Sequence, residues 1–239
     1  MKNTTVLLAS TALAMGATSV FAEGSITAVS WGGAYTKSQI EAYHKPWNAE
    51  TGNTVVSEDY SGGLAEIKTQ VETGSVTWDV VDVELSDAIR GCDEGLFEEI
   101  DHSVLPAALD GTPAVDDFID GALHDCAVGN IVWSTLIAFD KTKYANEPTT
   151  MADFFNVEKF PGKRGMRKSP KAMLEMALMG DGVPAEEVYD LMSTDEGLDR
   201  AFAKLDTIKD HVVWWEAGAQ PPQLLADGEV SMTIVWNGR

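Results

Sequence analysis

The stretch that decides the fold is Ser25–Asp59, which reads SITAVSWGGAYTKSQIEAYHKPWNAETGNTVVSED. Its first six residues, Ser25–Ser30, alternate in polarity and are rich in β-branched side chains, which predicts a strand. Residues 35–50 carry an apolar stripe at helical spacing and end at Thr51-Gly52-Asn53, a typical helix stop. Thr54–Asp59 again has the pattern of a strand. A strand, a helix and a second strand in this order indicate a β-α-β unit and therefore a parallel sheet.

The same alternation continues outward from this unit. Leu64–Glu72 predicts a helix, and the apolar run Asp79–Val83 is typical of a buried parallel strand. Gly129–Phe139 is strand-rich and predicts a crossover to a second lobe. The later elements are expected at Met151–Phe155, Pro170–Gly180, Ala185–Met192 and Leu198–Ile208 (helices) and at Gly165–Arg167, Val212–Glu216 and Ser231–Trp236 (strands). We therefore expect an α/β protein with two lobes, each a mainly parallel sheet flanked by helices.

The N-terminus predicts export from the cytoplasm. Lys2 precedes an apolar run from Val6 to Val20, and Val20-Phe21-Ala22 places small residues where signal peptidase requires them. The run is too short and too rich in Ala, Ser and Thr for a membrane span. We expect a signal peptide at residues 1–22 and a mature chain in the periplasm of a Gram-negative bacterium.

Charge and cysteine content narrow the possible partners. The formal net charge of −21 disfavours nucleic acid and anionic lipid as partners, because a polyanion repels them. The two cysteines, Cys92 and Cys126, are expected to form a disulfide in an oxidising compartment, with two buried free thiols as the alternative. Their separation, and the scatter of four histidines, does not match the ligand spacing of a metal site, so no metal and no cofactor are expected.

Aromatic residues gather near the predicted strand ends, where open α/β sheets bind their ligands. Trp31 precedes Gly32-Gly33, and Trp236 precedes Asn237-Gly238, so both should be exposed at a strand end and able to hold a cation by cation–π attraction. Trp78 and Trp133 are expected to fill the core instead.

A basic cluster stands out in this acidic chain. Six of its 17 basic residues lie within 13 positions: Lys159, Lys163, Arg164, Arg167, Lys168 and Lys171. We expect Lys159, Lys163 and Lys171 to lie on a solvated face. Arg167 or Lys168 follows a short predicted strand and is expected to bind a ligand carboxylate, for which the planar guanidinium of Arg is well suited.

Catalytic motifs are not evident. The sequence has no serine in a nucleophile elbow, and Gly33–Ser38 lacks the glycine that precedes lysine in a phosphate-binding loop. Acidic pairs are abundant, but nothing marks two that would converge as in a glycosidase. We expect a binding protein and not an enzyme, with a secreted hydrolase or a structural or chaperone-like envelope protein as the alternatives.

A family resemblance adds to these inferences. Four segments carry it in order and spacing: Ser30–Tyr35, Trp78–Val81, Pro161–Gly165 and Asp227–Gly238. The chain resembles the extracellular solute-binding proteins of the spermidine/putrescine (polyamine) class, which deliver solutes to ATP-driven (ABC) importers. The resemblance implies a type II-like fold, with lobe one in residues 23–130, lobe two in 131–232, and the start of a strand returning to lobe one in 233–239, after which the chain is expected to be truncated. It also implies a monomer that meets an inner-membrane permease.

The resemblance further implies which residues bind the solute. Trp31 and Tyr35 match the first aromatic pair of the class, Trp236 matches a later tryptophan, and Glu84 matches a polar ligand contact. Arg167-Lys168-Ser169 stands where polyamine binders have acidic residues, and a buried cation would oppose a polycation. We therefore prefer a ligand with one amine and one carboxylate, such as 4-aminobutyrate, over spermidine or putrescine. Arg167 would bind the carboxylate, and Glu216 or Glu84 would bind the amine beside Trp31, Trp215 and Trp236.

Overall fold

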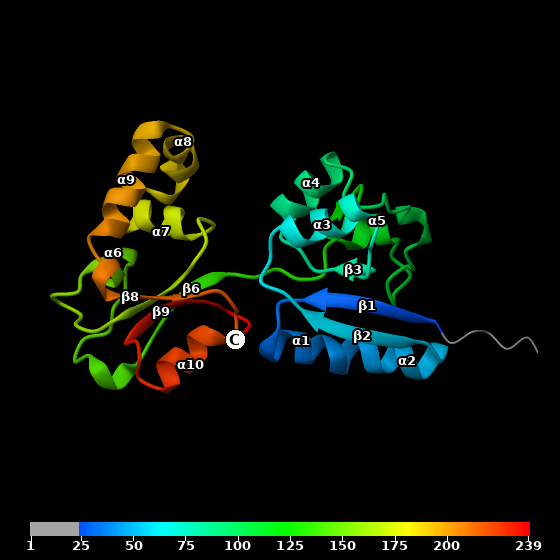
Figure 1. Ribbon diagram of the computed structural model, residues 1–239, viewed down its shortest axis with the longest axis horizontal. Helices are drawn as coiled ribbons and strands as arrows, with labels where there is room; N and C mark the ends of the chain where they lie inside the picture. Colours follow the sequence, from blue (N-terminus) through cyan, green and yellow to red (C-terminus); the bar gives the residue numbers. More distant parts are fainter. Residues whose placement is uncertain (1–23) are drawn as a thin grey trace, which may run out of the picture.

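The computed structural model describes residues 24–239, which form two α/β lobes joined by extended segments (Figure 1). The predicted signal peptide, residues 1–22, lies outside the described residues. The first lobe is built around β1, β2 and β3, and the second around β6, β7, β8 and β9. The two-lobed α/β architecture expected from the sequence is therefore confirmed.

The sheet of the first lobe has the strand order β2-β1-β3, and all of its strands are parallel. Helices α1 and α2 lie on one face of the sheet, and α3 and α4 lie on the other (Figure 1). The bounds are β1 Ser25–Ser30, α1 Gly33–Gln39, the π-helix η1 Ile40–His44, α2 Lys45–Thr51, β2 Thr54–Asp59, α3 Ala65–Thr73, β3 Val80–Val81 and α4 Leu85–Asp93.

The first β-α-β unit matches its prediction closely. Residues 33–51 form one helical run, interrupted only in hydrogen-bonding pattern by η1. The run ends at Gly52, whose φ of 75° lies in the left-handed region that glycine tolerates without steric cost. Strands β1 and β2 have the predicted bounds, and Ser25 pairs in register with Thr54.

Strand β3 is shorter than the sequence predicts. The expected strand Asp79–Val83 is reduced to Val80–Val81, which pairs only with β1 at the edge of the sheet. The continuous apolar run predicts a strand that is covered on both faces. This prediction is wrong, because Val80 is 57% exposed. The chain leaves the sheet after Val81 and starts α4 at Leu85, which places Asp82 and Glu84 beyond the carboxyl end of the strand.

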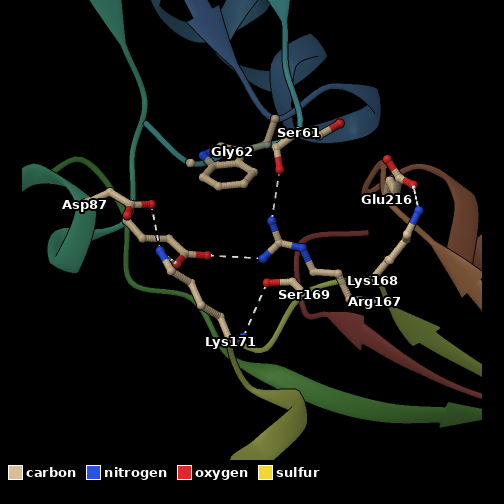
Figure 2. Close-up of a pocket in the computed structure, with 11 residues that line it drawn as sticks. Ser61, Gly62, Asp87, Arg167, Lys168, Ser169, Lys171 and Glu216 are labelled. Carbon is tan, nitrogen blue, oxygen red and sulfur yellow. Dashed lines mark hydrogen bonds and ion pairs between the residues drawn. The ribbon is translucent and has the colours of Figure 1, made fainter. Parts of the chain in front are cut away.

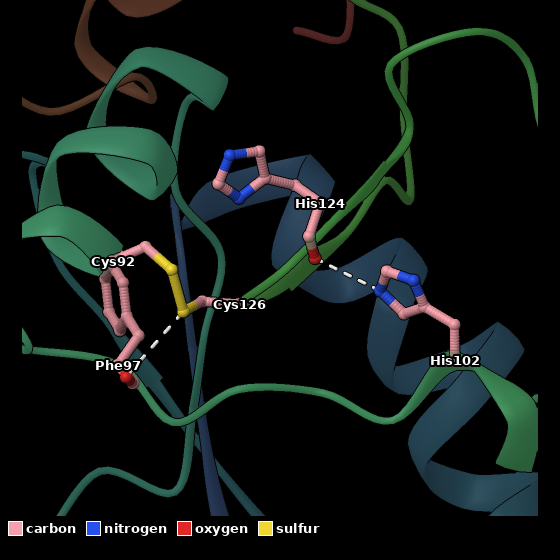
Figure 3. The surroundings of a disulfide bond; sticks show 5 residues. All are labelled: Cys92, Phe97, His102, His124 and Cys126. Atoms are coloured by element: carbon pink, nitrogen blue, oxygen red, sulfur yellow. Dashed lines mark hydrogen bonds between the residues drawn. A yellow bond between two sulfur atoms is a disulfide. The ribbon is translucent and has the colours of Figure 1, made fainter.

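The rest of the first lobe is irregular and is fastened by the predicted disulfide. Cys92 in α4 is bonded to Cys126, which precedes β5, so the bond ties the helix to the β4–β5 hairpin (Figure 3). Phe97 packs against α4 at Gly91, where a side chain would overlap its ring. The remaining elements are η2 His102–Val104, α5 Ala114–Asp117, β4 Leu123–His124 and β5 Ala127–Val128.

The sheet of the second lobe has the order β6-β9-β7-β8, in which β7, β8 and β9 are parallel and β6 is antiparallel to β9. Helices α6 to α9 lie on one face and α10 on the other (Figure 1). The bounds are β6 Thr135–Phe139, η3 Lys141–Lys143, α6 Met151–Phe155, β7 Arg164–Arg167, α7 Met173–Gly180, η4 Ala185–Glu187, α8 Val188–Met192, α9 Asp195–Asp206, η5 Lys209–His211, β8 Val212–Trp215, α10 Gln220–Ala226 and β9 Met232–Trp236.

The position of β9 differs from expectation. The family resemblance implies that residues 233–239 start a strand returning to lobe one, but β9 lies between β6 and β7 inside the second sheet. Its residues Met232 to Ile234 are at most 1% exposed, as expected for a strand with neighbours on both sides. The end of the chain contacts the first lobe, since Trp236 packs against Trp31 and Arg239 donates hydrogen bonds to the carbonyl oxygens of Gly32 and Trp31.

The second lobe buries many more apolar side chains than the first. The large hydrophobic core lies entirely in the second lobe, where it includes Phe154, Met166, Leu178 and Ile234. Arg164 is also fully buried there, and its guanidinium donates to the carbonyl oxygens of Phe154, Gly162 and Phe160 at 2.5–2.8 Å, which explains one member of the basic cluster. In the first lobe the buried apolar side chains are few: Val29, Leu64, Ile67, Ala88 and Ala114.

No helix within residues 24–239 combines the length and the apolar character needed to cross a bilayer.

Candidate functional site

A cavity of about 280 Å³ lies where the two lobes meet. Side chains and backbone from both lobes line it, and Figure 2 shows how they converge. The first lobe contributes Trp31, Ser61, Gly62, Gly63, Glu84 and Asp87, and the second contributes Arg167, Lys168, Ser169, Lys171 and Glu216. Ligands of open α/β sheets bind beyond the carboxyl ends of the strands, and β1, β7 and β8 all end at this junction.

Arg167 is the central cation of the cavity. It is the last residue of β7, and its side chain reaches across to the first lobe (Figure 2). One guanidinium nitrogen, Nη1, lies 3.4 Å from Oε1 of Glu84, and the other, Nη2, donates to the carbonyl oxygen of Ser61 at 3.0 Å. The guanidinium also lies 5.6 Å from the ring of Trp31 and 5.0 Å from that of Trp236. The structure thus places Arg167, and not Lys168, deep in the cleft.

A glycine allows the backbone to approach this cation. Gly62 has a φ of 88°, and a Cβ atom there would lie 2.5 Å from the indole of Trp31. Only glycine therefore fits between the turn and the ring. The close packing brings the carbonyl oxygen of Ser61 to the guanidinium of Arg167.

Lys171 forms a second connection between the lobes, which the sequence alone does not indicate. Its ammonium lies 2.8 Å from Oε2 of Glu84 and 2.6 Å from Oδ2 of Asp87. The expectation that Lys171 lies on a solvated face is therefore wrong, since two carboxylates of the first lobe bind it. Asp87 is only 2% exposed and also pairs with Arg90. The two acids lie around the start of α4, and no sequence pattern indicates that this helix faces the basic cluster.

Lys168 and Glu216 lie at the rim of the cavity. They form an ion pair of 3.2 Å, and both side chains are more than 60% exposed. Glu216 therefore faces solvent as well as the cavity, and water competes for its charge. Of the two acids expected to bind an amine, Glu84 is the deeper one.

Trp236 lines the larger hollow described next, whereas Trp215 is buried. Trp236 contacts Trp31, with ring centroids 5.5 Å apart, and Trp215 at the same distance. Trp215 is only 1% exposed and lines neither the 280 Å³ cavity nor the larger hollow described next. It was expected beside the ligand, but the structure places it behind Trp236, where it can support that ring.

Tyr35 faces a larger hollow of about 1080 Å³, lined mostly by the first lobe and also by Trp133, Trp236 and Arg239. This hollow shares Trp31 and Glu84 with the smaller cavity. Its hydroxyl donates to Oδ1 of Asn130 at 3.4 Å. Burial, followed by the negative charge of Asp82, raises the pKa of the Tyr35 phenol well above its ordinary value. Tyr35 is therefore neutral at physiological pH, and it does not line the cavity of Arg167.

The two tryptophans expected in the core are closer to this site than predicted. Trp133 is 41% exposed and contacts Trp236 with ring centroids 6.1 Å apart. Trp78 packs against Tyr60, and its indole nitrogen donates to Glu58 at 2.9 Å. Both line the larger hollow and neither is buried in a core.

Comparison with known proteins shows similarity to bacterial solute-binding proteins. Residues 42–239 match the family described as bacterial extracellular solute-binding protein. A gamma-aminobutyric acid-binding protein of Pseudomonas aeruginosa is 49% identical over 227 residues, which cover 95% of this chain and 62% of that protein. Its sequence is therefore similar over nearly all of this chain.

Two solved structures are also similar. The PBP MotA from A. tumefaciens B6, in complex with glucopine, is 37% identical with a TM-score of 0.80 over 89% of this chain and 64% of its own. A GABA receptor is 36% identical with a TM-score of 0.70 over 90% of this chain and 63% of its own. This chain thus spans less than two thirds of the length of each relative. Its fold and its match over residues 42–239 show that it belongs to the family of bacterial extracellular solute-binding proteins.

Proposed function

We propose that the protein captures a small ω-amino acid, such as 4-aminobutyrate, between its two lobes in the periplasm and delivers it to the permease of an ABC importer. It would do so as a monomer and without a cofactor. The family supports solute binding, and the similarity to a gamma-aminobutyric acid-binding protein supports this class of ligand.

The position of Arg167 carries the proposal. Its guanidinium is buried at the lobe junction between Trp31 and Trp236, and its Nη1 contact with Glu84 is 3.4 Å. A strong charge-assisted hydrogen bond measures about 2.7–2.9 Å, so this contact is weak. A ligand carboxylate that binds the guanidinium through two parallel hydrogen bonds would replace it.

The ammonium of a zwitterion would also bind Glu84, the acid that the ligand carboxylate displaces from Arg167. When Glu84 leaves Arg167, its Oε1 becomes free for the ligand ammonium, while Lys171 stays bound to Oε2. The exchange would leave the net charge of the cleft unchanged. A polyamine would instead add positive charge beside Arg167, Lys168 and Lys171, at a cost of several kcal/mol for a buried, uncompensated cation. Spermidine and putrescine are therefore less favoured as ligands than an ω-amino acid.

Titration calorimetry with 4-aminobutyrate, putrescine and spermidine tests the proposal. We expect saturable binding of 4-aminobutyrate and none of the polyamines at equal concentration. Tight polyamine binding without a response to 4-aminobutyrate would exclude the proposed ligand class.

Arg167→Ala should weaken 4-aminobutyrate binding by at least about 2 kcal/mol, because a hydrogen-bonded charge pair is lost. Lys163→Ala is the matched control, since it removes one exposed positive charge from the same basic cluster outside the cavity. Equal affinities of the two variants would remove Arg167 from the site.

A further inference from the structure

The larger hollow contains a carboxylate that has no cationic partner. Asp82 follows β3 directly, and its Oδ2 accepts hydrogen bonds from the hydroxyl of Ser30 and the side-chain amide of Gln39, both at 3.0 Å. Both donors are neutral. Among residues 24–239, no lysine, arginine or histidine forms an ion pair with Asp82.

A second acceptor beside it is also unsatisfied. Gln39 is only 6% exposed, and while its Nε2 binds Asp82, its Oε1 is buried and has no hydrogen-bond donor within the described chain. A buried acceptor without a partner costs about 1–3 kcal/mol, so the pair of Asp82 and Gln39 requires a donor. A group with several N–H donors and a positive charge would satisfy both.

The surroundings fit an alkylammonium group. Trp31, Tyr35, Trp133 and Trp236 line the same hollow, and aromatic faces attract cations. The guanidinium of Arg239 already lies 5.8 Å from the ring of Tyr35 and 5.2 Å from that of Trp236. The charge of Asp82 also contributes to the raised pKa of both Tyr35 and Tyr60.

The hollow adjoins the cavity of Arg167. Both are lined by Trp31 and Glu84, and Asp82 precedes Glu84 by two residues.

We propose that Asp82 and Gln39, with the ring of Tyr35, form a second ammonium subsite that takes the amine of ω-amino acids longer than 4-aminobutyrate. For zwitterions this inference rests on the proposed binding of the carboxylate by Arg167. The ammonium subsite itself can be tested without a carboxylate.

The experiment compares 4-aminobutyrate, 6-aminohexanoate and n-hexylamine by titration calorimetry on the full chain and on Asp82→Asn. The variant keeps the shape of the side chain and removes its charge. We expect it to weaken 6-aminohexanoate and n-hexylamine at least tenfold and 4-aminobutyrate less than threefold. Glu66→Gln, an exposed neutralisation in the same lobe, is the control and should change no affinity.

The outcomes separate this inference from the proposed function. Unchanged binding of 6-aminohexanoate and n-hexylamine by Asp82→Asn overturns the subsite, whatever happens to 4-aminobutyrate. If both zwitterions fail to bind the wild type, the role of Arg167 fails, and the Asp82 dependence of n-hexylamine binding alone decides for or against the subsite.

A measurement on the wild type covers the case in which Asp82→Asn does not fold. 6-(Trimethylammonio)hexanoate has the same charge and chain length as 6-aminohexanoate but no N–H to donate to Asp82 or Gln39. We expect it to bind at least tenfold more weakly, and equal affinity of the two compounds would overturn the proposal.

Discussion

Removing the Cys92–Cys126 disulfide should destabilise the first lobe far more than the second. The double variant Cys92→Ser/Cys126→Ser deletes the bond without leaving a free thiol. The cysteines are 34 residues apart, and in the chain-entropy model a closed loop of this length stabilises the fold by about 3.8 kcal/mol at 25 °C. At about 2–4 °C for each kcal/mol in a chain of this size, the melting temperature of the first lobe should fall by about 8–15 °C.

The structure indicates why the loss is local. The first lobe has few buried apolar side chains, whereas the hydrophobic core lies in the second lobe, and the bond joins α4 to the β4–β5 hairpin. Hydrogen exchange followed by mass spectrometry can resolve the two lobes. We expect faster exchange in peptides from α4 and β4–β5 and unchanged exchange in β7 and β9.

Two results would refute this reasoning. One is a urea-unfolding free energy for the variant within about 1 kcal/mol of the wild type, because the loop entropy would then not be the source of stability. The other is an equal increase of exchange in both lobes. Reductant provides the control, since it should destabilise the wild type and leave the serine variant unchanged.

Three further predictions concern the lobe junction and the pH dependence. Asp87→Asn should lower the free energy of unfolding by about 1.5–3 kcal/mol, because hydrogen bonds to the charged groups of Lys171 and Arg90 are lost, and urea titrations that show no change would contradict the described contacts. Trp236→Ala should cost about 3 kcal/mol of stability and weaken ligand binding, because this ring contacts Arg167, Trp31 and Trp215; thermal unfolding and calorimetry measure the two effects, and a variant equal to wild type in both would remove Trp236 from the site. Hydrogen bonds from the backbone of Thr149 and from Lys159 lower the pKa of Asp153 from 3.8 to about 2, so its contribution to stability is complete above about pH 4 and is lost as the pH falls towards 2. Asp153→Asn should therefore flatten the acid limb of a stability–pH curve, and an unchanged limb would contradict this assignment.

Local patterns in the sequence predict much of the fold. The strand Ser25–Ser30, the helical run that ends at Gly52 and the strand Thr54–Asp59 follow from periodicity and helix stop signals alone. The partner of a strand does not follow in this way. Ser231–Trp236 is predicted as a strand, but the sequence gives no indication that it pairs with β6 and β7.

The candidate site shows the same limit. Residue type and strand-end position indicate Trp31 and Arg167, and the family resemblance adds Glu84; the structure places all three around one cavity. Whether a residue faces the cavity depends on tertiary packing. Trp215 is buried behind Trp236 for this reason, and Lys171, which looks like an ordinary surface lysine in the sequence, bridges the lobes.

The position of β9 between β6 and β7 has a consequence for the order in which the second sheet folds. Strand β7 ends at residue 167, but its neighbour β9 begins only at residue 232. The edges of β6 and β7 therefore stay open until β9 is available to pair with both. Throughout that time the nascent second sheet consists of two unconnected pieces with free backbone groups, which makes this interval the moment of greatest risk of aggregation and the moment at which a holding chaperone would be most useful.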